Sequence, residues 1–275
     1  MHWILKHVHV NIPFTLLKER YLPRFLEGAI NPEIGFDASA LENYSQEAFE
    51  VVARQIHEHA LQVTIHAPFL DLSAGSTDPA VRGITRRRFE QVLQVARFFH
   101  PLRIVCHAGY DWKRYRYLKE KWIEGSLKTW EWMAEETRDL GAALMLENVY
   151  EQGPEDLLAL LKPLKAHGVG FCLDTGHQAA FSTTPLSQWV ETLHPFLGQL
   201  HLHDNSGEWD DHMALGRGNI DFESLFKTLR DIREAPLPIT LEPHQEEDLA
   251  PSLAYLEKIW PWACDSLGRL NLSCR

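Results

Sequence analysis

The sequence predicts an α/β protein that consists of a single (β/α)₈ barrel. Short apolar segments of strand length alternate with amphipathic segments of helical spacing along the chain. Eight strand-like segments recur, and 275 residues match a fold that typically needs about 250. No Gly/Ser-rich linker and no break in composition divides the chain, so we expect one domain over residues 1–275.

The expected strands are runs of four to seven residues, the usual length of strands that are buried on both faces. They cover Ile4–Val10, Glu33–Phe36, Leu61–Ile65, Leu102–Cys106, Ala142–Leu146, Val169–Leu173, Gln199–Leu202 and Leu237–Leu241. The alternative architecture is an open doubly wound sheet, which usually has a glycine-rich phosphate turn after its first strand. Here the first strand runs into Val10-Asn11-Ile12-Pro13 without a glycine, which favours the barrel.

The segments between these strands have the apolar spacing of helices with one buried face. Gln46–Ala60, for example, places Phe49, Val52 and Ile56 on one side. Further helices are expected at Val81–Phe99, Leu118–Leu140, Glu155–Lys165, Pro185–Leu193, Phe222–Ile232 and Leu249–Trp260. Asp78-Pro79 and Thr184-Pro185 are typical start signals for two of them.

The charge balance is acidic, with 27 Lys and Arg against 38 Asp and Glu, for a formal net charge of −11. This argues against a nucleic-acid partner, because a phosphate backbone needs clustered cations. The basic run Arg86–Arg88 lies within a helical pattern, where a solvated outer face is expected.

The location is expected to be cytoplasmic, with no membrane partner. No apolar run approaches the roughly 18 residues that span a bilayer, and the first residues lack a signal-peptide pattern. The four cysteines, Cys106, Cys172, Cys264 and Cys274, are expected to be reduced thiols.

Six consecutive expected strands end in His, Asp or Glu, and functional residues of such barrels lie at these C-terminal ends. They are His66, His107, Glu147, Asp174 with His177, His201 with His203, and Glu242, joined by Asp210, Asp211 and His212 from the seventh loop. One histidine after a strand is more often a cap or a core residue, but six such coincidences indicate a site. Unpaired buried carboxylates are costly, and a divalent cation removes that cost. Mixed imidazole and carboxylate ligands suit zinc, manganese, iron or cobalt.

These residues lie in motifs that resemble the xylose isomerase-like TIM-barrel superfamily, also called AP endonuclease family 2. The superfamily holds sugar isomerases and epimerases, and also endonuclease IV. The motifs are His66-Ala-Pro, His107-x-Gly-Tyr, Glu147-Asn, Asp174-Thr-Gly-His, His201-x-His-Asp, Asp211-His-x-x-Leu-Gly-x-Gly and Leu-Glu242-Pro. The resemblance extends from the second strand to about Pro243.

The resemblance implies two layouts of the metal site. In the epimerase branch one cation is held by Glu147, Asp174, His201 and Glu242. In the endonuclease IV branch up to three zinc ions share nine ligands, and all nine positions are matched in type here. The three sets are His66, His107 and Glu147; Glu147, Asp174, His201 and Glu242; and His177, Asp210 and His212.

The first functional hypothesis is a divalent-metal-dependent isomerase or epimerase of a sugar, sugar phosphate or keto acid. Glu147 and Glu242 would act as general base and acid around an enediolate. Arg217 resembles the substrate-contacting arginine of this branch, and His177 or His203 would bind substrate oxygens. His9 is either a substrate contact near the barrel mouth or a core residue. Candidate apolar walls are Phe69, Trp209 and Phe222.

The second hypothesis is a multi-metal phosphodiesterase or apurinic-site nuclease. The complete ligand match favours it, whereas the net charge of −11 and Arg217, at a position where the nuclease has Glu, argue against it. A small phosphoester would avoid the need to bind a duplex.

A third hypothesis is a barrel that binds metal and ligand without catalysis. The sequence does not specify the exact substrate, the native ion or a homo-oligomer, although relatives of this superfamily are often dimers or tetramers.

Overall fold

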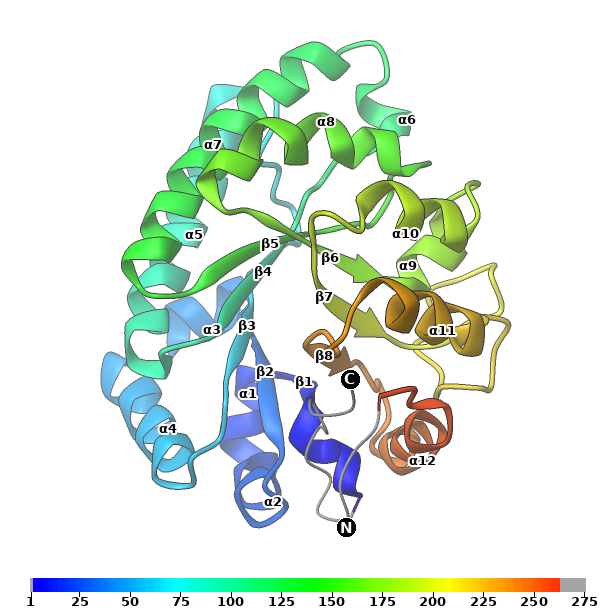
Figure 1. Cartoon of the computed structure of the whole chain (residues 1–275). Coiled ribbons are helices and arrows are strands. Elements are labelled where there is room, and N and C mark those ends of the chain that lie inside the picture. The colour runs from blue at the N-terminus through cyan, green and yellow to red at the C-terminus, as the bar shows by residue number, and fades with distance from the viewer. Residues whose placement is uncertain (1, 263–275) are drawn as a thin grey trace.

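Eight parallel strands close into a barrel in the order in which they occur in the chain (Figure 1). The computed structural model describes residues 2–262. The strands are β1 (Val8–Pro13), β2 (Asn31–Gly35), β3 (Thr64–His66), β4 (Arg103–His107), β5 (Ala143–Glu147), β6 (Gly170–Asp174), β7 (Leu197–Leu202) and β8 (Ile239–Leu241). β1 pairs with β8 through His9 and Thr240, which closes the sheet. The predicted (β/α)₈ barrel is therefore confirmed.

The strands begin and end close to the expected positions, except at the N-terminus. Trp3–His7 forms a 3₁₀ helix (η1), and β1 starts only at Val8. Ile4 and Leu5 are buried in that helix, so their apolar character reflects packing rather than a strand. Four strands, β3 to β6, run one residue further than expected and end on His66, His107, Glu147 and Asp174.

The helices lie around the outside of the barrel (Figure 1). They are α1 (Phe14–Leu16), α2 (Leu22–Glu27), α3 (Ala38–Asn43), α4 (Gln46–Glu58), α5 (Pro79–Phe99), α6 (Trp112–Tyr115), α7 (Lys119–Asp139), α8 (Pro154–Leu164), α9 (Thr175–Phe181), α10 (Leu186–Leu193), α11 (Phe222–Ile232) and α12 (Leu249–Ile259). Short irregular turns are η2 (Leu17–Tyr21, π-helical), η3 (Lys165–His167) and η4 (Glu246–Asp248). All seven expected helices are present. Among residues 2–262, no helix has the length and apolar character needed to cross a membrane.

One of the two expected helix starts has the expected chemistry, whereas α10 has Pro185 itself at its N-cap and no side chain that caps it. Asp78 caps α5, because its Oδ1 accepts a hydrogen bond from the Ala80 N–H at 2.8 Å, and Pro79 follows as the first helical residue. On the outer face of α5, Arg86 pairs with Glu90 and Arg88 with Glu42. Arg86 and Arg87 are exposed, as expected of a solvated helix face, whereas Arg88 is half-buried where it pairs with Glu42.

The side chains inside the barrel differ in character from strand to strand. Val105, Met145 and Cys172 of β4, β5 and β6 form a small apolar cluster. On β2, β3, β7 and β8 the corresponding side chains are polar although fully buried, among them Glu33, Thr64, Gln199 and Thr240. Cys106 and Cys172 are buried free thiols, and burial raises the pKa of both. Cys264 and Cys274 lie outside the described residues.

Candidate metal centre

The parallel strands bring the predicted ligands to one end of the barrel. His66, His107, Glu147 and Asp174 are the last residues of β3, β4, β5 and β6. His201 lies in β7, and Glu242 directly follows β8. In-register pairing places His107 beside Glu147 and Asp174 beside His201. Side chains that are up to 176 positions apart in the sequence, between residues 66 and 242, thus meet at the C-terminal mouth.

The carboxylate of Glu147 faces four imidazoles. Its Oε1 lies 3.2 Å from His177 Nδ1 and 3.8 Å from His107 Nε2. Its Oε2 lies 3.1 Å from His66 Nε2 and 3.4 Å from His201 Nδ1. The side chain is 1% exposed, so the imidazoles rather than solvent surround its charge. Glu147 is therefore the central group of the cluster.

Asp174 and Glu242 extend the cluster on the side of β6 to β8. Asp174 Oδ1 accepts a 2.6 Å hydrogen bond from the His177 N–H, which caps α9, and lies 3.2 Å from His203 Nε2. Glu242 Oε1 lies 3.0 Å from His201 Nδ1. Carboxylates from β5, β6 and the end of β8 thus surround one edge of the barrel mouth.

The loop after β7 contributes the remaining predicted ligands. Asp210 Oδ2 lies 3.3 Å from His177 Nε2 and 3.2 Å from His212 Nε2. His212 has a left-handed backbone with φ of 52°, which is strained for a residue with a side chain. The loop is held by buried Asp204, whose carboxylate accepts backbone N–H groups of Gly216 and Gly218. This anchoring keeps His212 directed into the cluster.

The close contacts determine the charge of the groups. Burial lowers the pKa of His177 and His201, but the facing carboxylates outweigh it and raise both pKa values well above the usual range. The same balance raises the pKa of His212 to about 9. Burial dominates at His107 and lowers its pKa to about 3. Burial raises the pKa of Glu147, but the surrounding histidines lower it well below the usual value. The Glu147 carboxylate is therefore anionic and is faced by the positive imidazoles of His177 and His201, whose protons a bound cation would displace.

The donor set fits divalent metal ions. Three buried atoms of predicted ligands have no hydrogen-bond partner, namely Asp174 Oδ2, His201 Nδ1 and Asp210 Oδ1. Leaving such atoms unsatisfied costs about 1–3 kcal/mol each. Ligand atoms lie within 4.8 Å of one another in several sets, including His66, His107 and Glu147; Glu147, Asp174 and His177; and His177, His203, Asp210 and His212. Imidazole nitrogens and carboxylate oxygens in such sets suit zinc, manganese, iron or cobalt.

Two contributors to the site were not identified from the sequence. Glu33 of β2 is fully buried, with its Oε1 2.9 Å from His201 Nε2. Burial raises its pKa, yet the facing His201 lowers it to about 2, so the group is a buried anion. The available signal was the glutamate that begins the short expected strand Glu33–Phe36. Exposed His244 stacks on His212 with ring centroids 3.7 Å apart, and it lies only two residues after Glu242.

The predicted substrate contacts lie in different surroundings. His9 is buried inside the barrel near Glu33 and Arg103, neither ring nitrogen has a hydrogen-bond partner, and burial lowers its pKa to about 4. Arg217 is exposed and pairs with Asp248, Nη1 to Oδ1, at 3.2 Å. A substrate contact by either residue stays a prediction.

The three predicted apolar walls also differ. Phe69 is 50% exposed and stacks on the His107 ring at 4.2 Å between centroids. Trp209, beside Asp210, is 72% exposed. Phe222 is fully buried in the hydrophobic core on α11, so the prediction that it walls the site is wrong. The helical periodicity that includes Phe222 already explains its apolar character.

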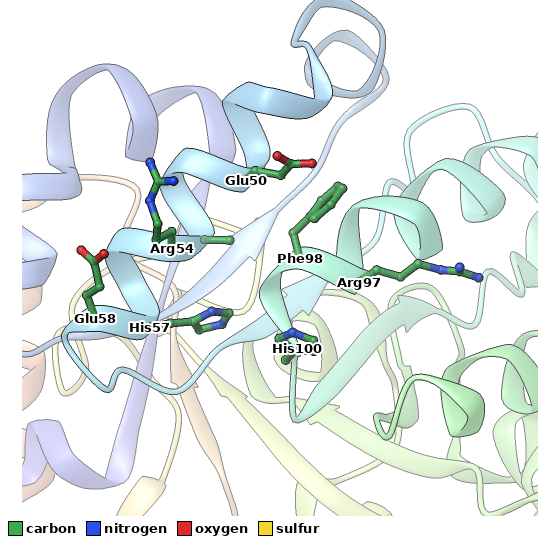
Figure 2. Close-up of a pocket in the computed structure, with 8 residues that line it drawn as sticks. Glu50, Arg54, His57, Glu58, Arg97, Phe98 and His100 are labelled. Atoms are coloured by element: carbon green, nitrogen blue, oxygen red, sulfur yellow. The ribbon is translucent and has the colours of Figure 1, made fainter.

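A separate surface hollow lies between α4 and α5 (Figure 2). It is lined by Glu50, Ala53, Arg54, His57, Glu58, Arg97, Phe98 and His100. His57, Glu58 and His100 lie where the two helices end. Helices of a (β/α)₈ barrel run antiparallel to the strands, so this is the end opposite the ligand cluster. The hollow is therefore distinct from the candidate metal centre.

Comparison with known proteins gives a family match over most of the chain. Residues 32–259 match the family described as "Xylose isomerase-like TIM barrel". A protein of Methanocaldococcus jannaschii named "Uncharacterized protein MJ1311" is 28% identical over 183 residues, 63% of this chain and 62% of its own length. The chain thus spans somewhat less than two thirds of that relative. The "Probable endonuclease 4" of Mycobacterium leprae is 26% identical over 206 residues, 70% of this chain and 77% of its own length.

Solved structures share the same architecture. The TTHB071 protein from Thermus thermophilus, described as soaked with ZnCl2, superposes with a TM-score of 0.79 at 29% identity. The alignment covers 92% of this chain and 97% of that protein. A D-tagatose 3-epimerase-like protein superposes with a TM-score of 0.76 at 22% identity, over 92% of this chain and 97% of its own. At that identity the similarity demonstrates a common fold and no more.

Proposed function

Because the chain belongs to the xylose isomerase-like TIM-barrel family, we propose that it hydrolyses a small-molecule phosphodiester at a centre of two or three divalent metal ions. Similar proteins include a sugar epimerase-like protein as well as a probable endonuclease 4, so the family by itself leaves the reaction open. The choice between these reactions depends on the number of ions that the site can hold.

The observation that carries the proposal is the position of Glu147 among four imidazoles. A single ion held by Glu147, Asp174, His201 and Glu242 would use only one of those imidazoles, His201. It would leave His66, His107, His177, Asp210 and His212 converging on the same mouth without a ligand role. A carboxylate with histidines on both oxygens is suited to bridge two ions. Buried groups of this kind are costly to keep, so a multi-ion centre accounts for more of them.

One of the similar proteins supports the proposal of a hydrolytic centre. The M. leprae relative is named as a probable endonuclease 4, whereas the epimerase-like structure is 22% identical and supports the fold alone. The Thermus protein, at 29% identity, was soaked with ZnCl2, which makes zinc the first ion to test.

A small substrate accounts for the charge better than a nucleic acid does. The net charge is −11, and long phosphate-backbone interfaces depend on several Lys or Arg contacts. Arg86 and Arg88 are paired on the outer face of α5, and Arg217 is paired with Asp248. These cations are therefore already engaged with carboxylates of the chain itself.

Cations bound here would activate a water molecule and stabilise the negative charge of the phosphate and the leaving oxygen. Glu147 would hold the ions together through its two oxygens. Glu242, whose side chain is 10% exposed at the mouth, would accept or return a proton. Phe69 covers the His107 ring and would keep bulk water from that side.

A second candidate is the isomerase or epimerase of the sequence analysis, and one observation favours it. Two glutamate oxygens face the same ring nitrogen of His201: Glu147 Oε2 lies 3.4 Å from it and Glu242 Oε1 lies 3.0 Å from it. A pair of glutamates beside one candidate ligand is what proton removal and return at a sugar carbon would need.

The deciding experiment is metal stoichiometry combined with two assays. Protein purified without added metal would be studied by elemental analysis as the wild type, His66→Ala, His107→Ala and the exposed control His194→Ala. We expect two or three equivalents of zinc or iron, loss of one equivalent in each site variant, and no loss in the control. Hydrolysis of bis(p-nitrophenyl) phosphate should accompany the metal. One equivalent of manganese or cobalt, unchanged in His66→Ala, with deuterium exchange into a ketohexose in heavy water, would instead establish the epimerase.

A further inference from the structure

We propose that Glu33 is the residue that positions His201 for metal binding, an inference that rests on the proposed metal centre. His201 is fully buried, and its two ring nitrogens have different surroundings. Nε2 lies 2.9 Å from Glu33 Oε1, toward the inside of the barrel. Nδ1 lies on the side of Glu147 and Glu242 and has no hydrogen-bond partner.

The Glu33 carboxylate is itself fixed from several strands. Its Oε2 accepts hydrogen bonds from Thr64 Oγ1 of β3 at 2.8 Å and from Gln199 Nε2 of β7 at 2.7 Å. Thr240 Oγ1 of β8 donates to the same oxygen at 2.9 Å. Asn11 Nδ2 of β1 lies 3.5 Å from Oε1. With these donors around it and no exposed surface, the carboxylate has one orientation, with Oε1 directed at His201.

The contact between Glu33 and His201 favours the imidazole tautomer that can bind an ion. A neutral imidazole that donates its Nε2 proton to Glu33 leaves the lone pair of Nδ1 directed at the cluster. Metal-binding histidines commonly donate their other N–H to a carboxylate, and the loss of such a partner typically costs about 10–100-fold in metal affinity. Glu33 therefore acts through His201. It is a positioning residue, because it is enclosed in the barrel and no substrate reaches it.

The test is a double-mutant cycle on metal affinity rather than on activity. The zinc dissociation constant would be measured by competition with a chromophoric chelator for wild type, Glu33→Gln, His201→Ala and the double variant. Glu33→Gln keeps the size of the side chain but places an amide against either His201 or the hydroxyl donors. We expect Glu33→Gln to weaken the tightest ion about 10–100-fold. In the His201→Ala variant, Glu33→Gln should not weaken zinc binding any further.

A control separates positioning from simple loss of structure. Thr64→Val removes one donor to Glu33 Oε2 and leaves the His201 contact in place, so it should lower the melting temperature of the chelator-treated protein with little change in zinc affinity. The visible absorption of the cobalt-loaded protein should change in Glu33→Gln and stay the same in Thr64→Val. If Glu33→Gln fails to fold, Glu33→Asp carries the test, since it keeps the charge but draws it back from His201.

Three results are distinguishable. Unchanged zinc affinity in Glu33→Gln would overturn the positioning role while leaving the metal centre intact. If Glu33→Gln weakens zinc binding equally in the wild type and in the His201→Ala variant, the positioning role is also overturned, because Glu33 would then not act through His201. A wild-type protein that binds no ion would refute the proposed function itself.

Discussion

The imidazole of His212 stacks face to face on that of His203, with ring centroids 3.6 Å apart and ring planes 4° apart. His203 belongs to the segment that follows β7 and reaches Asp174, whereas His212 belongs to the long loop and reaches Asp210. The stack therefore joins the loop to the barrel. It also encloses His203, which is 1% exposed, so a direct substrate contact by His203 would require the loop to move.

The stack makes a prediction about His212. His212→Ala should remove one metal equivalent and leave the others, because the carboxylates that His212 pairs with, Asp210 and Glu242, lie on one side of the cluster. Elemental analysis after gel filtration would measure this, with His194→Ala as an exposed control. Retention of all equivalents would show that the loop holds no ion.

Substitution of Glu147 should reduce turnover and metal content more than substitution of any single histidine does. Glu147→Gln keeps the shape but removes the charge that faces four imidazoles. We therefore expect turnover to fall by about a thousandfold or more, and more than one ion to be lost. Steady-state hydrolysis of bis(p-nitrophenyl) phosphate and metal analysis would check both parts. Activity close to that of the wild type would contradict both candidate reactions.

Removal of metal should lower stability through ligand linkage. An ion that binds only the folded chain stabilises it by about 2.7 kcal/mol at a concentration 100 times its Kd. For a domain of this size that corresponds to a shift in Tm of roughly 5–10 °C. Differential scanning calorimetry before and after dialysis against a chelator would measure it. Identical melting curves would argue against a native metal.

Gly176 is required by the packing of His203. A Cβ added at Gly176 would overlap the His203 ring at Cε1, inside the buried cluster. Gly176→Ala must therefore displace the ring, and overpacking of this kind costs about 1–3 kcal/mol. Urea unfolding should show that loss, together with weaker zinc binding. Gly83→Ala is the control, since nothing lies within 4 Å of an added Cβ there. Equal effects in the two variants would refute the packing argument.

Glu151 should make stability depend on pH. It is buried, and its oxygens accept backbone N–H groups of Val149 at 2.7 Å and Tyr110 at 3.3 Å. Burial raises its pKa from 4.5 to about 7, against the effect of these bonds. The folded chain therefore holds the proton more tightly than the unfolded chain does. The protonated carboxyl group therefore contributes to the free energy of unfolding, and this contribution is complete below the unfolded pKa of 4.5. About 3 kcal/mol of it is lost as the pH rises to 7.

Glu151→Gln cannot titrate and should flatten that decline. Urea unfolding of the chelator-treated protein between about pH 4.5 and 8 would measure the slope for the wild type and the variant, with exposed Glu58→Gln as a control. The same slope in Glu151→Gln and wild type would show that Glu151 has an ordinary pKa in the folded state.

Much of the site could be predicted because its residues follow recognisable strands. His66, His107, Glu147 and Asp174 each come after an aliphatic run, and parallel strands end at the same rim of a barrel. Glu33 and His244 could not be found in this way. Glu33 lies inside a strand rather than at its end, and His244 lies in a loop whose path no periodicity describes.

The sequence by itself determined the alternation of strands and helices, the barrel and the rim on which the ligand residues lie. These features depend on local periodicity and on the common direction of parallel strands. Only the tertiary structure decided that Glu147 faces four imidazoles, that Glu33 supports His201 and that Phe222 is a core residue. The distances between side chains of different strands depend on the register and stagger of the closed sheet and on the path of each loop. The spacing of residues along the chain does not determine these features.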